Sequence, residues 1–349
     1  MVSIKAVAAA AAVSQGTVSH VLNHPERVAE ATKERVHAAM RELGYVRNSA
    51  ARQLRLGVSS TFGLIVNNDW NPFFNELARA IEDEVQDRGW NLVVARSGME
   101  ADRERAHLEA FEQHRFRGIF IVPTEPASLP AIEAVYHRGT PCVLVDWNTD
   151  ASALPSVGID DVRGGVLAGR HLVQTGRRRL LFAGNPERLR HAADRLAGFR
   201  RGAAVAPDAT VSVVDVPGLN VRSGREVGRR VVDLPAAERP DGIFCANDLV
   251  ALGAMRELVA GGLCIPNDIS LVGYDDVDFA EQALVPLTTV RQYPYEVGRL
   301  AASWLVEESG PSADPPARVM LEPVLIERES SGRGHGREVG RPACAQGAE

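Results

Sequence analysis

The hydrophobic pattern of the first 47 residues predicts three short helices. Residues 4–12 favour a helix because they are rich in alanine. In residues 15–23, Val18 and Val21 lie three apart on one apolar stripe, and the opposite face is polar. Residues 30–43 carry apolar side chains on one face, and a glycine follows where a helix C-cap is expected. The sequence therefore begins with a small all-helical unit.

The pattern changes after an arginine-bearing linker with helical propensity, residues 48–57. In the body, residues 58–330, apolar strands alternate with helical segments. Repeated strand-then-helix units are typical of mostly parallel sheets with helices on both faces, and there are enough units for two sheets. The expected strands are 62–66, 92–95, 118–122, 142–145, 180–183, 211–214, 242–245 and 271–274, and the expected helices are 73–88, 103–114, 129–138, 163–175, 195–204, 224–232 and 249–260.

The body is predicted to form two doubly wound α/β lobes, each built from two stretches of chain. Lobe 1 takes about 60–160 and 290–320, and lobe 2 takes about 161–289 and 321–330. Residues 331–349 are rich in Gly, Arg and Glu without periodicity, so we expect a disordered tail there.

Charge is divided unevenly between the helical unit and the rest of the chain. Residues 1–57 hold eight Lys/Arg and four Glu, a balance of +4, while the remainder holds 31 basic and 41 acidic residues, a balance of −10. This asymmetry is typical of a polyanion-binding module on an acidic body, because acidic surface elsewhere repels a polyanion from the wrong face.

No pattern in the sequence indicates a metal site, a disulfide framework or a membrane segment. The four cysteines are widely spaced and form no Cys-x-x-Cys pair. The alanine-rich start lacks the long apolar core of a signal peptide, and no run approaches the ~18 apolar residues that a membrane-spanning helix needs. We therefore expect a cytoplasmic protein with no membrane contact, no metal and no cofactor.

Four motifs follow one another near the N-terminus: Val13-Ser14-x-x-Thr17-Val18-Ser19-x-Val21-Leu22-Asn23, Glu34-Arg35-Val36, Glu42-Leu43-Gly44-Tyr45 and Ala50-Ala51-Arg52-x-Leu54. In this order they closely resemble the lactose- and purine-repressor family of bacterial transcription regulators. The resemblance implies a helix-turn-helix headpiece that binds double-stranded DNA. Its recognition helix would be residues 15–23, with Gln15, Gly16 and His20 facing base edges in the major groove.

Two of these three residues have side chains that suit base reading. Gln15 can pair with adenine through two hydrogen bonds and His20 can donate to guanine, whereas Gly16 has no side chain. Other DNA-contact candidates carry hydroxyl, amide or phenol donors for phosphate oxygens, and such contacts set register without reading sequence. These candidates are Ser14, Thr17, Ser19, Asn23 and Tyr45.

The resemblance also makes residues 48–56 a hinge helix that becomes ordered on DNA. Asn48 and Arg52 are then among the DNA contacts, and Leu54 enters the minor groove between central base steps and kinks the duplex. The alternative for Leu54 is an ordinary linker residue that packs on the body.

The headpiece departs from the family at three alanines. Ala6 stands where Asp is usual, Ala12 where the turn between helices usually has Gly, and Ala29 where Ser or Asp caps the third helix. Each change is expected to cost about 1 kcal/mol through a lost cap or a left-handed backbone position. His20 and His24 have a metal-ligand spacing, but the helix is expected to end before the second of them, so no metal site is predicted.

Motifs in the body continue the resemblance and look like those of periplasmic sugar-binding folds: Asn71-Pro72-Phe73-Phe74, Asp146-Trp147, Arg195-Leu196-Ala197-Gly198-Phe199, Asn247-Asp248, Gly273-Tyr274-Asp275-Asp276, Thr288-Thr289-Val290 and Leu325-Ile326-Glu327-Arg328. Most of their polar residues follow predicted strands, where open parallel sheets present ligands. By position, the family's effector contacts correspond to Asp69, Phe73, Asp146, Trp147, Arg195, Leu219, Asn247, Asp275 and Gln292.

The chemistry of these candidates favours a sugar or sugar derivative as effector. A polyol needs forked donors and charged acceptors for its hydroxyls, which Arg195 and Asp275 supply, and an apolar face for its C–H surface. A nucleobase is disfavoured, because purine-binding relatives are expected to have an aromatic residue near 219 and polar groups near 189 and 191. This chain has Leu219, Leu189 and His191 there.

Some candidates have alternative roles. Asp146 and Asp248 could instead cap helices, and Phe74 is expected in the core rather than in the pocket. The adjacent pairs Asp160-Asp161 and Asp275-Asp276 are expected to point their side chains apart.

Two other classes of protein share such a body. A solute receptor for transport is excluded by the headpiece and the missing signal sequence. An enzyme acting on a small polar ligand between the lobes is the alternative function, although the sequence contains no nucleophile elbow, phosphate loop or paired metal carboxylates.

We therefore predict a repressor that binds a pseudo-palindromic operator as a homodimer and is controlled by a small-molecule effector. The C-terminal residues contain no apolar heptad, so a dimer is expected rather than a tetramer. Effector binding is expected to change lobe closure and so to order or melt the hinge. The sequence leaves open whether the effector is an inducer or a corepressor.

Overall fold

The computed structural model describes residues 2–45, 59–68, 70–147, 152–307 and 318–332. It divides into two compact units, Met1–Val58 and Ser59–Glu349. The first unit is the headpiece and the second is the body. The predicted hinge helix and the sequence-predicted contacts Asn48, Arg52, Leu54 and Asp69 lie outside the described residues.

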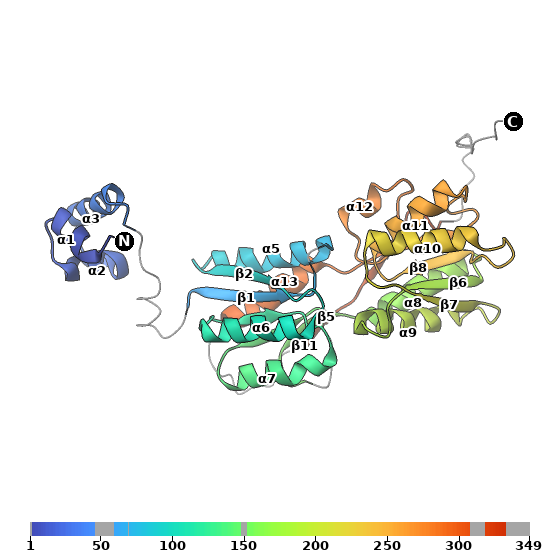
Figure 1. Cartoon of the computed structure of the whole chain (residues 1–349), viewed down its shortest axis with the longest axis horizontal. Helices are drawn as coiled ribbons and strands as arrows, with labels where there is room; N and C mark the ends of the chain where they lie inside the picture. Colours follow the sequence, from blue (N-terminus) through green and yellow to red (C-terminus); the bar gives the residue numbers. More distant parts are fainter. Residues whose placement is uncertain (1, 46–58, 69, 148–151, 308–317, 333–349) are drawn as a thin grey trace. The chain divides into compact units, whose positions relative to one another are not determined.

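The described residues of the headpiece form three α-helices around a small apolar core (Figure 1). Alternation of buried and exposed positions at helical spacing places Val7, Val18, Val21 and Val36 in that core. The helices are α1 (Ile4–Ala10), α2 (Gln15–Asn23) and α3 (Glu30–Glu42), with a 3-10 turn at Pro25–Arg27.

The sequence departures of the headpiece appear in its backbone. Ala12, between α1 and α2, has φ of 51°, in the left-handed region that favours glycine. Ala29 precedes α3 without a side-chain cap, whereas the Ser14 side chain accepts a hydrogen bond from the Thr17 backbone N–H and caps α2. The expected strain and missing cap are therefore both present.

Lobe 1 of the body is a parallel six-stranded sheet in the order β11-β5-β4-β3-β1-β2. Helices α5 and α13 cover one face, and α6 and α7 cover the other (Figure 1). The inner strands β1, β3, β4 and β5 are buried on both faces, whereas the edge strands β2 and β11 are partly exposed. The elements are β1 (Thr61–Val66), α5 (Pro72–Gln86), β2 (Asn91–Arg96), α6 (Ala101–Gln113), β3 (Ile119–Ile121), α7 (Leu129–His137), β4 (Cys142–Val145), β5 (Ser156–Ile159), α13 (Pro294–Glu307) and β11 (Arg318–Leu321).

Lobe 2 is a parallel four-stranded sheet in the order β7-β6-β8-β9. The helix pair α10 and α11 lies on one side of it and the pair α8 and α9 on the other (Figure 1). The elements are α8 (Asp161–Gln174), β6 (Arg179–Gly184), α9 (Arg190–Ala203), β7 (Thr210–Asp215), α10 (Val221–Asp233), β8 (Gly242–Cys245), α11 (Asp248–Ala260), β9 (Ser270–Val272) and α12 (Asp278–Glu281).

The chain crosses between the lobes after β5, after β10 (Thr289–Arg291) and after β11. Strand β10 pairs antiparallel with β12 (Val324–Ile326). The body continues beyond the expected start of the tail, because Ser331 is fully buried and its Oγ lies 2.6 Å from Thr288 Oγ1 and 2.7 Å from His171 Nε2. The prediction that residue 331 begins a disordered tail is corrected at that point.

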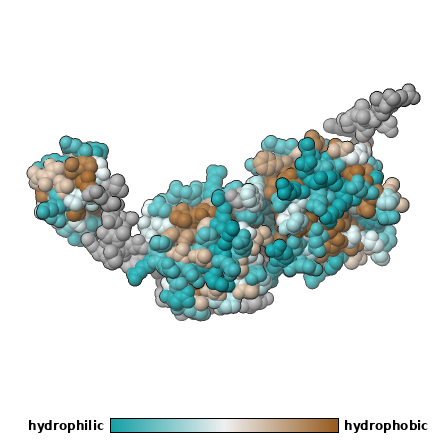
Figure 2. All heavy atoms as spheres, viewed as in Figure 1, coloured by the Kyte–Doolittle hydropathy of each residue, from teal (hydrophilic) through white to brown (hydrophobic). Residues whose placement is uncertain are grey.

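The body surface on the face shown in Figure 2 is mainly hydrophilic, with apolar side chains gathered in separate patches. Large apolar side chains that stand exposed include Val93 and Val94 on β2 and Phe279 on α12. None of the described helices is long and apolar enough to cross a membrane.

Candidate functional site

Helix α2 of the headpiece separates a buried stripe from an exposed polar face. Val18 and Val21 are buried, while Gln15, Gly16 and His20 are exposed on the other side. A Cβ added at Gly16 would meet only the Ser14 side chain, at 3.5 Å, so the backbone there is open to a close approach. The three residues expected to face base edges therefore share one accessible surface.

The other predicted DNA contacts of the headpiece are held by local bonds. Ser14 Oγ lies 2.9 Å from Thr17 Oγ1, and Asn23 Nδ2 donates to the Ser19 carbonyl oxygen at 2.8 Å. Tyr45 is half-buried against the headpiece core. These bonds hold side chains at both ends of α2, and their residue types are ones that commonly donate to phosphate oxygens.

The metal-ligand spacing of His20 and His24 falls at the end of α2. His24 follows the last residue of α2, and the two rings meet edge to face with centroids 6.1 Å apart. The described residues contain no group of three or more His, Cys, Asp or Glu side chains that could hold a metal ion.

A small cavity of about 30 Å³ lies between the two lobes. It is built at the carboxyl ends of strands in both sheets, which is where open parallel sheets present ligands. Lobe 1 supplies residues that follow β1, β2 and β4, lobe 2 supplies residues that follow β6, β7, β8 and β9, and Gln292 follows β10. The lining residues are Asn67, Asn68, Asn71, Phe73, Phe74, Met99, Asp146, Leu189, His191, Arg195, Leu219, Asn247, Asp275 and Gln292.

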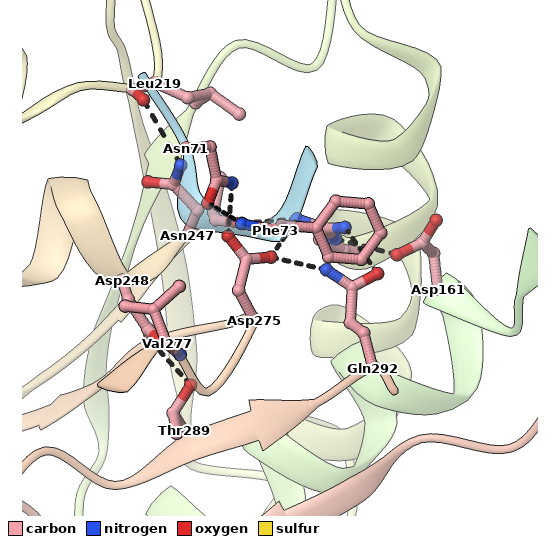
Figure 3. A network of polar contacts seen from close by, with 12 residues as sticks. Asn71, Phe73, Asp161, Leu219, Asn247, Asp248, Asp275, Val277, Thr289 and Gln292 are labelled. Carbon is pink, nitrogen blue, oxygen red and sulfur yellow. Dashed lines mark hydrogen bonds and ion pairs between the residues drawn. The ribbon is translucent and has the colours of Figure 1, made fainter. Parts of the chain in front are cut away.

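Asp275 is the centre of the polar network that crosses the cavity. Asn71 Nδ2 in lobe 1 donates to Asp275 Oδ2 at 2.6 Å, and Gln292 Nε2 donates to Asp275 Oδ1. Figure 3 shows both amides pointing at this one carboxylate. Asn71 also accepts from the Phe73 backbone N–H at 3.1 Å and so caps α5. The same side chain therefore begins a lobe 1 helix and holds a lobe 2 carboxylate.

Arg195 is buried on α9 and is held by other protein groups. Its Nε donates to Asp161 Oδ1 at 2.7 Å and its Nη1 donates to the Ala246 carbonyl oxygen at 2.6 Å. Its guanidinium carbon lies 3.7 Å from the centre of the Tyr274 ring. The Asp275 carboxylate is 4.0 Å from Nη1. Arg195 therefore fixes the cavity wall through its bonds to Asp161 and Ala246. It also lines the cavity, where a ligand could contact it.

Burial shifts the pKa values of titratable groups that line the cavity. It raises the pKa of Asp275 to about 6, an effect that the nearby Arg195 guanidinium opposes. Burial also raises the pKa of Asp146, and the neighbouring Asp161 carboxylate adds to that rise. Burial lowers the pKa of His191 to about 3, and Arg195 contributes in the same direction. His191 is therefore a neutral ring at physiological pH.

Comparisons with known proteins match both units of the chain. Residues 3–48 match the model of the bacterial regulatory proteins of the lacI family, and residues 170–331 match the periplasmic binding protein-like domain. The ribose operon repressor of Escherichia coli K12 is 32% identical over 336 residues, which cover 95% of this chain and 100% of that protein. The chain belongs to the LacI family. It is a DNA-binding transcriptional repressor with an effector-binding body, and not an enzyme.

Two further LacI-family members show how closely the whole chain is matched. The HTH-type transcriptional repressor PurR of Escherichia coli O1:K1 is 32% identical over 348 residues, or 98% of this chain and 100% of its own length. A crystal structure of the lac repressor dimer bound to operator and the anti-inducer ONPF is 27% identical, with a TM-score of 0.82 over 95% of this chain and 99% of that one. The predicted headpiece and two-lobed α/β body are confirmed.

The cavity of this LacI-family protein brings together seven of the nine sequence-predicted effector candidates. Asp69 lies outside the described residues. Trp147 is buried in the lobe 1 core and faces a neighbouring depression that Asp146 and His191 also line. Phe74 belongs to the lobe 1 core, as expected, but also lines the cavity.

Two neighbouring polar residues have structural roles that the sequence left open. Asn247 caps α11 by accepting from the Val250 backbone N–H, and its amide donates to the Leu219 carbonyl oxygen. Asp248 is not the cap; it is fully buried and accepts from Thr289 Oγ1 and the Val277 backbone N–H. Asp248 therefore stabilises lobe 2, and burial raises its pKa.

The two adjacent aspartate pairs do point apart. Asp160 caps α8 while Asp161 binds Arg195. Asp275 faces the cavity, while Asp276 forms ion pairs with Arg291 and Arg328.

Sequence reasoning did not propose Asn67, Asn68, Asn71 or Met99 for the cavity. The asparagines were detectable in principle, because Asn67 and Asn68 follow a predicted strand and Asn71 precedes Pro72 at a helix start. Met99 has no comparable signal, since it lies in a loop beyond β2.

Proposed function

We propose that this LacI-family repressor binds a pseudo-palindromic operator as a homodimer in the bacterial cytoplasm, and that a sugar or sugar derivative controls this binding. The cavity between the lobes carries the proposal, because its lining combines carboxylate, amide and aromatic groups in one space between the lobes. In the headpiece, Gln15 and His20 are the proposed base-reading residues.

The distribution of groups in the cavity supports a polyol. Asp275, Asn71 and Gln292 place acceptors and donors on one side, where hydroxyl groups can exchange for the existing bonds. Phe73, which is buried and lines the cavity, offers an apolar ring to the C–H surface of a sugar. The relative named as the ribose operon repressor is consistent with this class of ligand.

The same lining argues against a nucleobase. Leu189 and Leu219 present aliphatic side chains where a stacked base would need an aromatic one. His191 is neutral and lies beside Arg195, which is already bonded to Asp161 and Ala246. A purine would therefore find few directed partners in this region.

The proposed homodimer is supported by exposed apolar side chains on both lobes and by a relative. Val93 and Val94 are 42% and 44% exposed on β2, the free edge of the lobe 1 sheet, and Phe279 on α12 of lobe 2 is 58% exposed. The lac repressor structure with TM-score 0.82 is a dimer on its operator. A two-fold dimer presents two recognition helices to two half-sites.

The proposed control of DNA binding acts through the bond between the lobes. A ligand that bonds to Asp275 competes with Asn71, whose side chain also caps α5 in lobe 1. The effector therefore changes the relative stability of open and closed lobes by the difference in its affinity for them. The effector releases DNA if it favours the lobe closure in which the hinge melts. It strengthens DNA binding if it favours the closure in which the hinge is ordered.

A polarisation assay with the full chain tests this function. A labelled operator is titrated with and without pentoses, hexoses, disaccharides and purines. We expect a sugar to change operator affinity by at least about fivefold, a coupling of the size usual for allosteric proteins. Asp275→Asn should abolish that change, whereas Asp208→Asn, which alters an exposed ion pair with Arg178 away from the cavity, should leave it intact. A purine response without any sugar response would contradict the proposed effector class.

The dimer and the hinge are tested with DNA variants. A half-site should bind far more weakly than the full palindrome, and equal affinity would refute the dimer. Leu54→Ala should weaken specific binding more than nonspecific binding, because intercalation requires a kinked site. Equal losses on both DNAs would show that Leu54 does not enter the duplex.

A further inference from the structure

Lobe 2 contains a second cavity, which is separate from the one between the lobes. It has a volume of about 360 Å³ and lies between α10 and the strands β6 and β7. Its lining runs along β7 from Thr210 to Val214 and along α10 from Val227 to Leu234, and we call it the edge pocket. Among the described residues, the edge pocket and the inter-lobe cavity have no lining residue in common. Small-molecule sites usually have volumes of about 300–1,000 Å³, so this pocket is large enough for a ligand.

The edge pocket is open because α10 packs mainly on α11 rather than over the edge of the sheet. A Cβ at Gly224 of α10 would lie 2.1 Å from the Val250 carbonyl oxygen of α11. One at Gly228 would lie 2.7 Å from the Ala254 carbonyl oxygen, so both glycines allow a close approach of the two helices. Strand β7 is the last strand of the described sheet on this side. Helix α10 therefore leaves part of the sheet face beside β7 uncovered.

Most of the edge pocket is lined by apolar side chains. Leu181 on β6 and Val227 and Val231 on α10 belong to the buried core of lobe 2 and also line the pocket. Val214 on β7 and Leu234 after α10 are half-buried. An apolar group that enters this space removes apolar surface from water, which is favourable. The pocket is therefore suited to the apolar part of a ligand.

Two exposed arginines add positive charge to this apolar lining. The Nε of Arg179 donates to the Arg239 carbonyl oxygen at 2.8 Å, and within the described part of the chain no carboxylate forms an ion pair with Arg179. Arg230 is bonded to Glu226 in an exposed pair on α10, a kind of pair that contributes little stability. A guanidinium binds a carboxylate through parallel N–H donors. Arg179 is therefore placed to receive an anionic group at the pocket.

We propose that the edge pocket is a second ligand site, which binds a small carboxylic acid with a branched aliphatic or aromatic body. The body lies against Leu181, Val214 and Val231, and the Arg179 guanidinium binds the carboxylate. Glu238, the one carboxylate among the described lining residues, is exposed, so water and salt screen its repulsion of an anion. This site goes beyond the proposed function and does not depend on it.

Probes of one shape and different charge test the class of ligand. Isothermal titration calorimetry on the full chain compares 4-methylpentanoate with 4-methylpentanamide and 4-methylpentylamine, and benzoate with benzamide and benzylamine. In at least one series the carboxylate should bind at least about tenfold more tightly than its amide, because hydrogen bonds between charged groups are stronger. Carboxylates that bind no more tightly than their amides, or more weakly than the amines, overturn the proposed ligand class. An absence of measurable binding in both series overturns the site.

Charge substitutions at the pocket test the assigned residues. Arg179→Gln should lower the affinity for the carboxylate to that for the amide. Arg230→Gln should cause a smaller loss, because Glu226 already competes for this guanidinium. Glu238→Gln should strengthen carboxylate binding by about twofold at low salt, since it removes a like charge. Weaker carboxylate binding in Glu238→Gln, or unchanged binding in Arg179→Gln, contradicts the proposed orientation of the ligand.

Arg229→Gln is the matched control for charge. Arg229 is exposed on α10 and does not line the pocket, and its Nε donates to the Arg225 carbonyl oxygen at 3.4 Å. Its substitution removes one positive charge from the same helix, so carboxylate binding should stay as in the parent protein. Losses of equal size in Arg229→Gln and Arg179→Gln would show an effect of net charge alone and would overturn the assignment to the edge pocket.

A substitution that fills the pocket tests its location. Ser212 is exposed on β7 and lines the pocket, and its Oγ donates to the Leu180 carbonyl oxygen at 3.1 Å. Ser212→Phe should abolish carboxylate binding, whereas Ser212→Ala, which removes the same hydroxyl without filling the space, should retain it. Thermal melting checks that both variants are folded. Carboxylate binding that persists in folded Ser212→Phe places the probe elsewhere and overturns the proposal.

Discussion

In the headpiece, the residues proposed to touch DNA stand on one exposed helix face, whereas the residues proposed to touch the effector come from many segments and bind one another. Gln15 and His20 are exposed five positions apart on α2. Asn71 and Asp275 are separated by 204 positions and share a 2.6 Å hydrogen bond. The exposed face of α2 can bind DNA without breaking bonds within the protein. A ligand in the cavity must instead replace hydrogen bonds that the protein already makes.

Because of this difference, substitutions in the two regions should affect ligand affinity and the free energy of unfolding differently. Substitutions on the exposed face of α2 should change DNA binding without changing the free energy of unfolding, because little is buried there. Substitutions around the cavity should change both, since removing one partner leaves a buried polar group unpaired.

The largest effect is expected from Gly165→Ala on α8. A Cβ at Gly165 would lie 2.1 Å from the Arg195 carbonyl oxygen and 2.7 Å from the Phe199 nitrogen, so α8 and α9 would have to move apart. We expect a loss of at least about 3 kcal/mol in the free energy of unfolding, measured by urea denaturation, together with loss of the effector response. Gly16→Ala is the control, because the same atom there meets nothing closer than 3.5 Å. Equal stability of the two variants would contradict the tight α8–α9 contact.

The next effect is a pH dependence that arises from Asp275. Burial raises the pKa of its carboxyl to about 6, so the folded state holds the proton more tightly than the unfolded state does. The stability that this group contributes is therefore full below about pH 4 and is lost as pH rises to about 6. The unfolding free energy of the parent protein minus that of Asp275→Asn should fall by up to about 3 kcal/mol over this range and then stay level. A difference that rises with pH would show that the carboxylate is held ionised instead.

These two predictions depend on contacts that local sequence patterns do not contain. The alternation of strands and helices predicted the two-lobed body, and the positions after the strands predicted most of the cavity lining. The pattern could not show that Asn71 and Gln292 converge on Asp275, because that depends on how the lobes meet. It also could not show that Asn247, a proposed contact, uses its side chain to cap α11.

Elements near the lobe crossings were also missed. Helix α13 was not predicted, although Val297, Ala301 and Leu305 recur every four residues and are buried. Strands β5, β10, β11 and β12 were missed, although β3, β4, β8 and β9 are equally short and were predicted. The predicted strands lie in longer continuous apolar runs, whereas the missed strands are interrupted by polar or small residues or, like β12, contain only three apolar residues. Ser331 was assigned to the tail on composition alone, yet it is bonded to Thr288 and His171.

A smaller effect, confined to DNA binding, is expected from Gln15→Ala. Removing an exposed base-reading side chain should weaken specific operator binding by about 1–3 kcal/mol. The thermal melting of the full chain should stay unchanged, because Gln15 is exposed at the start of α2. Polarisation with the operator and with an unrelated duplex of equal length measures both affinities. An equal loss on the two duplexes would make Gln15 a backbone contact rather than a base contact.

The smallest effect is expected at the turn between α1 and α2. Ala12 has φ of 51°, where a Cβ is strained, and glycine relieves that strain. Glycine also gains freedom in the unfolded chain, which offsets part of the benefit, so Ala12→Gly should stabilise the headpiece by only about 0.5 kcal/mol. Native-state hydrogen exchange resolves so small a change through the amide protons of α3, which pack on the same core. Protection should rise in α3 and remain constant in the body strands. Equal or lower protection in α3 would show that the turn relaxes around alanine, and that the headpiece is not weakened at this position.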